Sequence, residues 1–529
     1  MPSPFLKIRR FAITAGYLKP SQLWWRIWFK CRRPRVAALP APPVAKVSLK
    51  TEFPTGYTVF GDSGFRFLNA VHRADDAADW NRAEWGKLWL YNLHYFDCLR
   101  QPEISEAEGS MWIERWIAEN PPFRGNGWEP YPISLRIVNW IKWAMSGHEL
   151  SPTALASLAL QTRYLRKRIE RHLLANHYLA NAKALVFAGM FFSGDEAAEW
   201  LADGCEIYRD QLPEQILADG GHFERSPMYH SIILEDLLDL VNLGAPLFLE
   251  SPVRQMLRWL AVMTGPDGRI ARVNDAADDI ALAPEKLLDY AARLGFERPT
   301  EFPSCVDLPA SGYARIAAGN WTLVCDGGAI GPDYQPGHSH ADTLSFELWY
   351  GQERILLDSG TGEYIDTPLR REQRGTAGHN TLTVDGKNSS AVWGTHRVAE
   401  RAKIVDRKFD GSRFSAAHDG FAPMLHRRTW EATPEKTVVT DSLDGEGKHR
   451  IDLYWHFAPG AKVTILPGHA CVEVGDRRFA ISLSGCGEHE VVVGHFSPEF
   501  GIVEEIPVLH SRYHSVLPHK IQTSIQLEI

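Results

Sequence analysis

The sequence is poor in cysteine, has no long apolar run and shows no excess of basic charge. Its 529 residues include seven cysteines, which are scattered and form no Cys-x-x-Cys pair, so neither a disulfide framework nor a cysteine zinc site is predicted. No stretch approaches the roughly 18 apolar residues that a membrane-spanning helix needs, so the body of the chain is expected to be soluble. The formal net charge of −8 argues against nucleic acid as a partner.

The overall amino-acid composition is that of an ordinary globular protein with many large aromatic residues. Apolar residues make up 44% and charged residues 23%, and the length suits two large domains or three smaller ones. The 18 tryptophans suit a groove that stacks on sugar rings, or they fill a large core.

The N-terminus, residues 1–47, reads as a basic and aromatic arm followed by a linker. A basic cluster at residues 7–10 precedes a short apolar run at 11–18, but no small-residue cleavage site follows promptly, so a standard cleavable signal is not expected. Aromatic and basic residues then interleave over 21–35. This pattern predicts an interfacial helix on an anionic membrane, or a helix packed against the rest of the protein.

Apolar residues recur at helical spacing between Trp85 and Leu294. Ile133, Ile137 and Ile141, for example, fall on one helix face. The pattern predicts helices over residues 132–143, 151–174, 177–192, 195–217, 228–243, 252–264 and 284–294. Such an array of antiparallel helices over residues 48–300 indicates an (α/α) toroid or a helical solenoid.

After Ser311 the apolar period changes to two. Residues 343–350 alternate cleanly, and similar short runs recur to residue 493 between glycine and aspartate turns. This half, residues 301–529, is therefore predicted to be an antiparallel β-sandwich. The fold class is α+β multidomain, with the N-terminal (α/α) toroid followed by the C-terminal sandwich.

The densest polar cluster is Gly-His-Ser-His-Ala-Asp at residues 337–342. In an extended chain His338 and His340 project to the same side. Two imidazoles and one carboxylate, such as His340, His379 and Asp358, are an adequate zinc set. Hydrogen-bonded structural histidines are the alternative.

Two polar segments occur where helices are predicted to start. One contains Asn176 and His177, and the other contains Glu224, Arg225 and Tyr229. Because helix N-termini favour anionic groups, these side chains could form a cleft for an acidic ligand.

Taken in order, these motifs resemble the heparinase II/III family of polysaccharide lyases. The resemblance is carried by Tyr-Asn-Leu-His-Tyr-Phe-Asp at 91–97, Trp-Glu-Pro-Tyr-Pro at 128–132, Asn-His at 176–177, Ser-Pro-Met-Tyr at 226–229, and the segments 337–342, 356–362 and 378–382. The family's fold, a helical toroid followed by a β-sandwich, agrees with the periodicity. One departure is Asn274, in an acidic loop where the family pattern leads us to expect glycine.

The resemblance implies roles for these residues. Tyr229 would act as Brønsted base and acid, Asn176 and His177 would engage the substrate carboxylate, and His338 would assist proton transfer. A divalent metal, zinc, would be held by His340, Asp358 and His379. Substrate contacts are expected from Tyr91, Asn92, His94, Trp128, Glu224, Arg225 and Arg374.

The predicted function is cleavage of an acidic, uronate-containing polysaccharide by β-elimination. One alternative is a glycoside hydrolase, for which Glu224 with Asp219 or Glu129 would supply the carboxylate pair. Another is a non-catalytic glycan-binding protein of exopolysaccharide assembly. The resemblance favours the cell envelope or periplasm as the location, whereas the missing signal favours the cytoplasm, and peripheral membrane contact is expected through the N-terminal arm.

Overall fold

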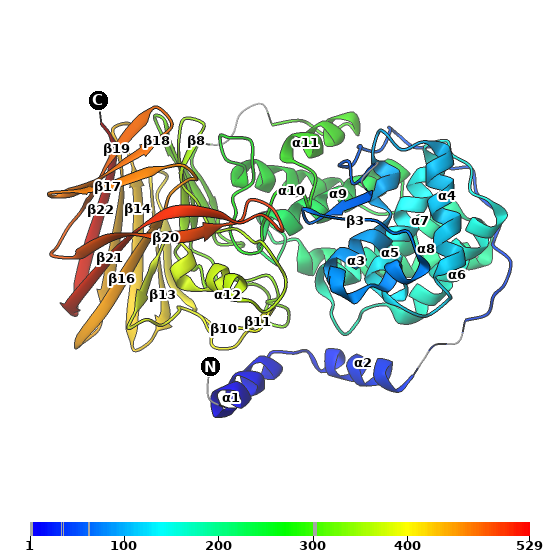
Figure 1. The fold of residues 1–529 in the computed structure, drawn as a ribbon, viewed down its shortest axis with the longest axis horizontal. Coiled ribbons are helices and arrows are strands. Elements are labelled where there is room, and N and C mark those ends of the chain that lie inside the picture. The colour runs from blue at the N-terminus through cyan, green and yellow to red at the C-terminus, as the bar shows by residue number, and fades with distance from the viewer. Residues whose placement is uncertain (1–3, 33, 35, 62–63, 300–303, 529) are drawn as a thin grey trace.

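The computed structural model describes residues 4–32, 34, 36–61, 64–299 and 304–528. Helices occupy the first part of the chain and antiparallel strands the second (Figure 1). The predicted fold class is confirmed. The boundary predicted between residues 300 and 301 lies outside the described residues, as do Arg33 and Arg35 of the basic arm. Among the described residues no helix is long and apolar enough to cross a membrane.

The helical part packs around one large apolar core. Its main helices are α3 (Lys87–Tyr95), α4 (Glu106–Glu119), α5 (Pro130–Met145), α6 (Pro152–Arg168), α7 (Ala175–Phe191), α8 (Asp195–Gln215), α9 (Pro227–Leu243), α10 (Glu250–Met263) and α11 (Pro284–Arg293). A small sheet of β1 (Phe60–Gly61), β2 (Gly64–Phe67) and β3 (Ala70–His72) lies against them, and α1 (Pro4–Gly16) and α2 (Pro20–Cys31) precede it. Ile133, Ile137 and Ile141 of α5 are fully buried, as the spacing predicts.

The predicted helix over 151–174 stops early, and this difference shapes the site. Helix α6 ends at Arg168, and α7 begins at Ala175. Leu174 (φ 64°), which precedes α7, and Ala175 (φ 54°), its first residue, both have left-handed φ values. A non-glycine residue in this region carries backbone strain that the surrounding structure must offset, and such strain is common at functional sites. The break directs the start of α7, with Asn176 and His177, toward a cavity.

The β part contains three larger antiparallel sheets. One has the order β4 (Val306–Leu308), β5 (Tyr313–Ala318), β6 (Trp321–Asp326), β7 (Phe346–Tyr350), β8 (Glu353–Leu356). The largest runs β12 (Ile404–Phe409), β13 (Arg413–Phe421), β14 (Met424–Ala432), β15 (Lys436–Asp444), β22 (His519–Leu527), β19 (Arg477–Leu483), β18 (His469–Val474), β17 (Lys462–Leu466). The third runs β20 (Glu488–Phe496), β21 (Glu504–Val516), β16 (Lys448–His456), β9 (Leu382–Val384).

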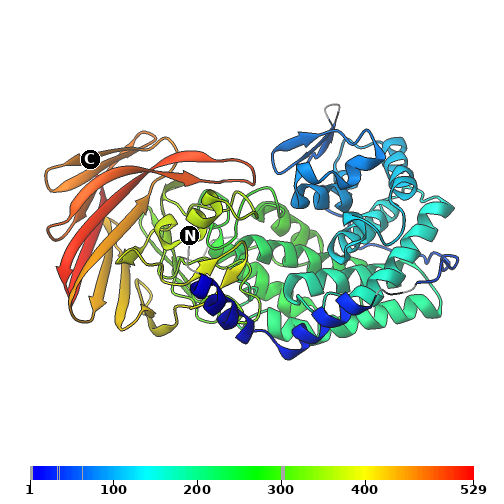
Figure 2. The same cartoon turned by 60° about the horizontal axis from the view of Figure 1, so that its bottom comes forward.

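Short elements project from the sheets toward the helices. They are α12 (Pro368–Arg374) and the hairpin of β10 (Val392–Trp393) and β11 (Arg397–Val398), which lie where the two parts of the chain meet (Figures 1 and 2). The strand predicted over 343–350 begins only at Phe346, because Leu344 is left-handed (φ 68°). Residues 337–345 therefore form a loop that reaches the helical part.

The tryptophans mainly fill the core. Trp116, Trp140 and Trp200 are fully buried among the helices, and Trp430 and Trp455 are fully buried between the sheets. Of the two interpretations of the tryptophan content, core filling is the one that the structure supports.

Candidate functional site

A cavity of about 500 Å³ opens at the junction of the helical and β parts. Helices α3, α5, α7 and α9 line most of it, and the β part contributes His338, Tyr364 and His396. Among the described lining residues there are several tyrosines and no tryptophan. The sugar-stacking groove of tryptophans that the composition allowed is therefore not found in this cavity.

Tyr229 reaches the cavity from the first turn of α9. Ser226 caps this helix: its hydroxyl accepts from the Tyr229 amide (3.2 Å) and donates to the backbone carbonyl of Asp275. Pro227 follows at the first helical position, where its missing N–H has no helical partner to lose. The motif Ser-Pro-Met-Tyr thus fixes both the helix start and its distance from the Asp275 loop.

The Tyr229 ring stacks on His338, with ring centroids 3.8 Å apart. Its hydroxyl lies 3.2 Å from that of Tyr364. Burial, followed by the neighbouring Tyr364, raises the pKa of Tyr229 well above its ordinary value of 10. The phenol therefore carries its proton at neutral pH.

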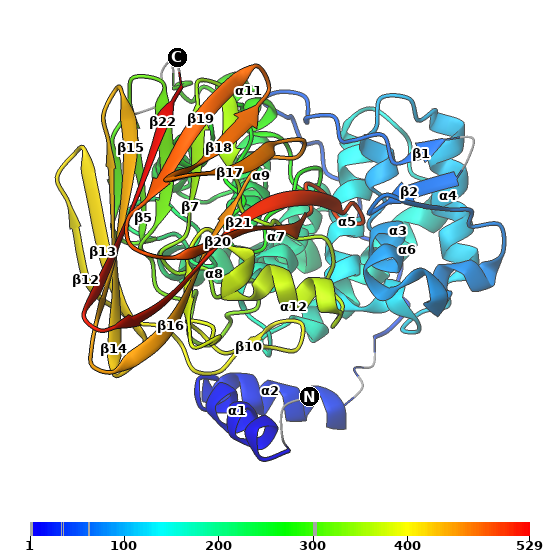
Figure 3. The same ribbon diagram turned by 60° about the vertical axis from the view of Figure 1, so that its left-hand side comes forward.

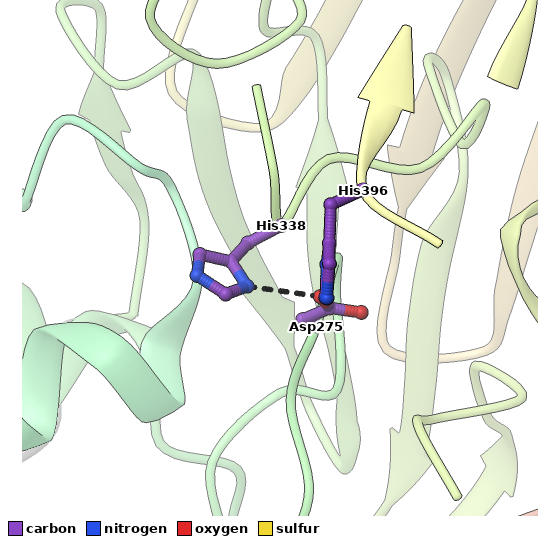
Figure 4. A group of neighbouring side chains, drawn as sticks. All are labelled: Asp275, His338 and His396. Atoms are coloured by element: carbon purple, nitrogen blue, oxygen red, sulfur yellow. Dashed lines mark hydrogen bonds and ion pairs between the residues drawn. The ribbon is translucent and has the colours of Figure 1, made fainter. Parts of the chain in front are cut away.

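His338 is held between two buried carboxylates. Its Nδ1 lies 3.0 Å from Oδ2 of Asp275, and its Nε2 lies 3.4 Å from Oε2 of Glu224. Figure 4 shows His338 and His396 converging on Asp275, and the ligand atoms of these three residues lie within 4.8 Å of one another. Burial, followed by the charge of His338, lowers the pKa of His396 to about 4, so this second ring is neutral near pH 7.

Asn176 lines the cavity and is held in place by the buried Glu224. Its side-chain Nδ2 donates to both oxygens of that carboxylate (2.9 and 3.1 Å), and its backbone amide donates to Oε1 (3.0 Å). Glu224 itself is 1% exposed and does not line the cavity. Its expected role as a substrate contact is therefore replaced by a positioning role toward Asn176 and His338.

His177 faces the cavity beside Asn176. Its Nδ1 lies 3.2 Å from Oε2 of Glu170, which Asn181 holds in place through Nδ2 (3.2 Å). Burial opposes the imidazolium, but the Glu170 charge and hydrogen bond outweigh it and raise the pKa of His177 above its ordinary value of 6.5. A cation at the start of α7 is suited to bind a carboxylate.

Tyr91 and Asn92 line the cavity on α3, as predicted. The Tyr91 hydroxyl donates to Glu129, which also accepts from Lys87 (3.0 Å). Asn92 donates to the backbone of its own helix at Leu88 (2.8 Å). Both side chains thus form part of the helical wall of the cavity.

Two other predicted contacts, His94 and Trp128, are wrong. His94 is fully buried: its Nε2 lies 2.9 Å from the Trp80 carbonyl, and its Nδ1 accepts from the Trp116 indole (2.9 Å). The Trp128 indole donates to the Asn120 carbonyl (3.2 Å). Neither residue lines the cavity, because both His94 on α3 and Trp128 in the short 3-10 turn Asn126–Trp128 are buried in the helical part.

The predicted contacts of Arg225 and Arg374 with substrate are wrong for a similar reason. The Arg225 guanidinium donates to the Ala329 carbonyl. Arg374 is 1% exposed and donates to the carbonyls of Ser339 and Gly394 (both 3.0 Å). Both guanidiniums bind loop backbone, and neither lines the cavity.

Asp275 is one of the site residues that sequence reasoning missed, together with Glu170, Tyr364 and His396. Its buried carboxylate binds His338, His340 (2.8 Å) and both terminal nitrogens of Arg370, and the Arg370 charge helps to hold the pKa of Asp275 well below its ordinary value despite burial. The signal was the acidic loop in which Asn274 replaces the expected glycine. Asn274 is left-handed (φ 58°), a conformation that glycine adopts freely and asparagine tolerates.

His340, Asp358 and His379 form a fully buried trio whose ligand atoms lie within 4.8 Å of one another. His340 binds Asp275 through Nε2, and His379 binds Asp358 through Nδ1 (2.7 Å). The other two ring nitrogens, Nδ1 of His340 and Nε2 of His379, are buried without a hydrogen-bond partner.

Buried carboxylates surround this trio. Burial, followed by their mutual repulsion, raises the pKa of Asp326 well above its ordinary value, and burial also raises the pKa of Asp342. Burial lowers the pKa of His340 to about 3, so its ring is neutral and its free nitrogen can act as a ligand. Orphaned imidazole nitrogens beside buried acids fit a divalent cation.

The three carboxylates predicted for glycoside hydrolysis do not line the cavity. Asp219 accepts from the backbone and hydroxyl of Ser311 (2.7 and 3.0 Å), Glu129 accepts from Lys87, and Glu224 is buried. None of these three carboxylates lines the cavity. The geometry therefore does not favour a hydrolase that uses these three carboxylates.

Two family models match the chain and together cover most of it. The model described as heparinase II/III N-terminus matches residues 111–288, and the model described as heparinase II/III-like, C-terminal, matches residues 303–518.

Curated relatives and solved structures point in the same direction. A heparin-sulfate lyase of Bacteroides stercoris is 24% identical over 53% of the chain, and one of Bacteroides thetaiotaomicron is 23% identical over 76% of it. The matches span 45% and 64% of those relatives' own lengths. A crystal structure of heparinase III aligns with a TM-score of 0.68 at 18% identity, covering 89% of this chain and 80% of that one, and shares the fold.

Proposed function

Because the chain belongs to the heparinase II/III family, we propose that it is a polysaccharide lyase that cleaves a uronate-containing glycan by β-elimination. The observation that carries this proposal is the pairing, across one cavity, of a proton-transfer pair, Tyr229 and His338, with two groups suited to a carboxylate, Asn176 and His177. A glycan of the glycosaminoglycan type fits the curated relatives, which are named heparin-sulfate lyases.

The chemistry requires charge neutralisation first. In a 4-linked uronate, removal of the C5 proton beside an ionised carboxylate concentrates negative charge on the carboxylate and C5. The cationic His177 and the amide of Asn176 stabilise that charge as it develops. Since Glu170 and Glu224 hold these donors in place before substrate arrives, little reorganisation is needed during the reaction.

His338 is the group that we assign to removing the C5 proton. Asp275 orients its ring through Nδ1 and leaves Nε2 for proton transfer. Glu224, 3.4 Å from Nε2, can accept a hydrogen bond from the protonated nitrogen.

Tyr229 completes the elimination as the acid. As the C4–C5 double bond forms and the C4–O bond breaks, its phenol gives its proton to the leaving oxygen. The raised pKa of Tyr229 suits this role, because the resting phenol is protonated. No water enters, and the product is an unsaturated uronide.

The test is an absorbance assay on a panel of uronate polymers that includes heparan sulfate, hyaluronan, alginate and bacterial exopolysaccharides. A rise in ultraviolet absorbance from the conjugated uronide, matched by new chain ends, is the expected result. New reducing ends without the absorbance would indicate hydrolysis. Polymer binding without either signal would indicate a non-catalytic glycan-binding protein.

The pH dependence gives a second expectation. The cationic form of His177 exists below its raised pKa, so activity should fall as the pH rises through a value above 6.5. Glu170→Gln removes the charge that raises the pKa while burial still lowers it, so the alkaline limb should move to lower pH by about one unit, with roughly tenfold less activity on that limb.

The measurement is kcat/KM against pH for wild type and Glu170→Gln. Glu199→Gln is the matched control, because Glu199 pairs with Arg166 on the protein surface. Its profile should overlay that of wild type. An unmoved alkaline limb in Glu170→Gln would rule out His177 as the titrating cation.

We also propose that His340, Asp358 and His379 hold one zinc ion. The free nitrogens of His340 and His379 supply neutral imidazole ligands, and Asp358 supplies a carboxylate. When bound, the ion would neutralise the buried acids and brace the loop that carries His338. It is assigned a structural role, because His338 reaches the cavity while the trio is fully buried.

A further inference from the structure

The first 50 residues differ in charge from everything that follows. They contain 11 lysines and arginines and no aspartate or glutamate. Since the whole chain has a net charge of −8, the remaining residues carry a net charge of −19. Positive charge is therefore concentrated in the first 50 residues. Helices α1 and α2, which lie in this segment, are called the arm below.

The arm lies along one side of the molecule, outside both the helical and the β parts (Figures 1 and 3). Helix α1 is attached to the β10–β11 region: the Trp393 indole donates to the Thr14 hydroxyl (3.2 Å), and Arg9 pairs with Glu400 (3.0 Å). Helix α2 is attached to the helical part through Gln22, which is fully buried and donates to the Leu173 carbonyl (3.3 Å). Both helices are thus anchored through one face.

The opposite face of α1 is apolar. Phe5, Ile8 and Phe11 are 78%, 68% and 60% exposed. Their spacing places them on one stripe of the helix, between the basic residues Lys7 and Arg9. A helix that only packed on the protein would turn this stripe toward the body.

Helix α2 repeats the arrangement. Leu23, Trp24 and Ile27 are 45%, 58% and 62% exposed, while Gln22 faces the body. Arg26 and Lys30 are exposed beside them. Both helices therefore present large apolar side chains and basic side chains to the solvent together.

We propose that the outward face of the arm binds the surface of an anionic lipid bilayer. Convex helices with protruding aromatic and aliphatic side chains enter the headgroup region to a depth of roughly 5–10 Å, and neighbouring Lys and Arg meet the lipid phosphates. The absence of any acidic residue in residues 1–50 matches a negatively charged partner.

Vesicle flotation of the full chain tests the proposal. With vesicles of phosphatidylcholine and phosphatidylglycerol in equal parts the protein should float, and with phosphatidylcholine alone it should stay at the bottom of the gradient. Leu23→Ser/Trp24→Ser/Ile27→Ser should weaken binding by about tenfold or more. Arg26→Gln/Lys30→Gln should also weaken it by about tenfold or more, and added salt should weaken wild-type binding.

The matched control is Phe248→Ser/Val493→Ser/Val516→Ser, which removes three side chains of comparable exposure (102%, 63% and 67%) elsewhere on the surface. It should float like wild type, and thermal unfolding should show that all variants are folded. Equal flotation on neutral vesicles, no flotation at all, or an equal loss in the control would overturn the proposal. So would a concentration-dependent dimer in sedimentation velocity that the arm variants abolish while vesicle binding persists, because a second copy would then be the partner.

Discussion

Tyr229→Phe is expected to lower turnover by about 10³-fold, the contribution typical of a positioned proton donor. The substitution removes one oxygen and keeps the ring that stacks on His338 at 3.8 Å. The cavity walls and the carboxylate-binding side chains, Asn176 and His177, do not change. Polymer affinity should therefore stay within about twofold of wild type. Initial rates from uronide absorbance, together with calorimetric binding to the same polymer, check both parts.

Tyr57→Phe is the matched control for this variant. Tyr57 also lines the cavity, and its hydroxyl donates to the Ala281 carbonyl (3.1 Å), away from the proton-transfer pair. Its turnover should be close to wild type. If Tyr229→Phe turned over at the wild-type rate, the proton of the leaving group would come from another source, and the roles proposed for Tyr229 and His338 would fail.

The second large expected effect is on stability and follows from the zinc ion proposed at His340, Asp358 and His379. At a free zinc concentration about 100 times the dissociation constant, binding to the folded state alone adds about 3 kcal/mol to the free energy of unfolding. A chelator should therefore lower the melting temperature of the wild-type protein by roughly 3 °C, because the unfolding entropy of about 2.1 cal/mol/K per residue is large in a chain of this length. Asp358→Asn, which keeps the size of the side chain but removes its charge, should abolish this difference and lower the bound zinc from about one equivalent to near zero.

Asp441→Asn is the control for Asp358→Asn, because Asp441 is an equally buried aspartate in the same part of the chain. It binds His426 Nε2 (2.6 Å) and Arg428 (2.7 Å) without belonging to the trio. The Asp441 variant should lose stability and keep both its zinc and its sensitivity to the chelator. Equal zinc content in wild type and Asp358→Asn, measured by elemental analysis, would refute the assignment.

The fold could be predicted from the sequence because periodicity is a local property. The spacing of Ile133, Ile137 and Ile141 predicts the buried face of α5, and alternation over 343–350 predicts the strand that becomes β7. Predictions failed where a backbone conformation interrupts the period. Leu174, Ala175 and Leu344 have left-handed φ values, and the spacing of apolar residues does not predict such backbone dihedral angles.

The sequence could predict residues of the candidate site only where a short motif marks the start of a helix or a loop. Short motifs carry Tyr229, Asn176, His177 and His338, and these four residues line one cavity. His94 belongs to a motif of the same kind but is fully buried, since the core side of α3 carries it. A motif indicates which side chains are present, whereas the direction of each side chain depends on helix packing.

By itself, the sequence determined the order of helices and strands, the family motifs and the concentration of positive charge in the first 50 residues. Only the tertiary structure decided that Asp275 joins His338, His340 and Arg370, and that the arm turns its apolar side chains outward. The physical reason is that burial and hydrogen-bond partners arise from contacts between distant segments: Asp275 and Arg370 are 95 residues apart. Local composition specifies which elements form, and long-range packing specifies which of their side chains meet.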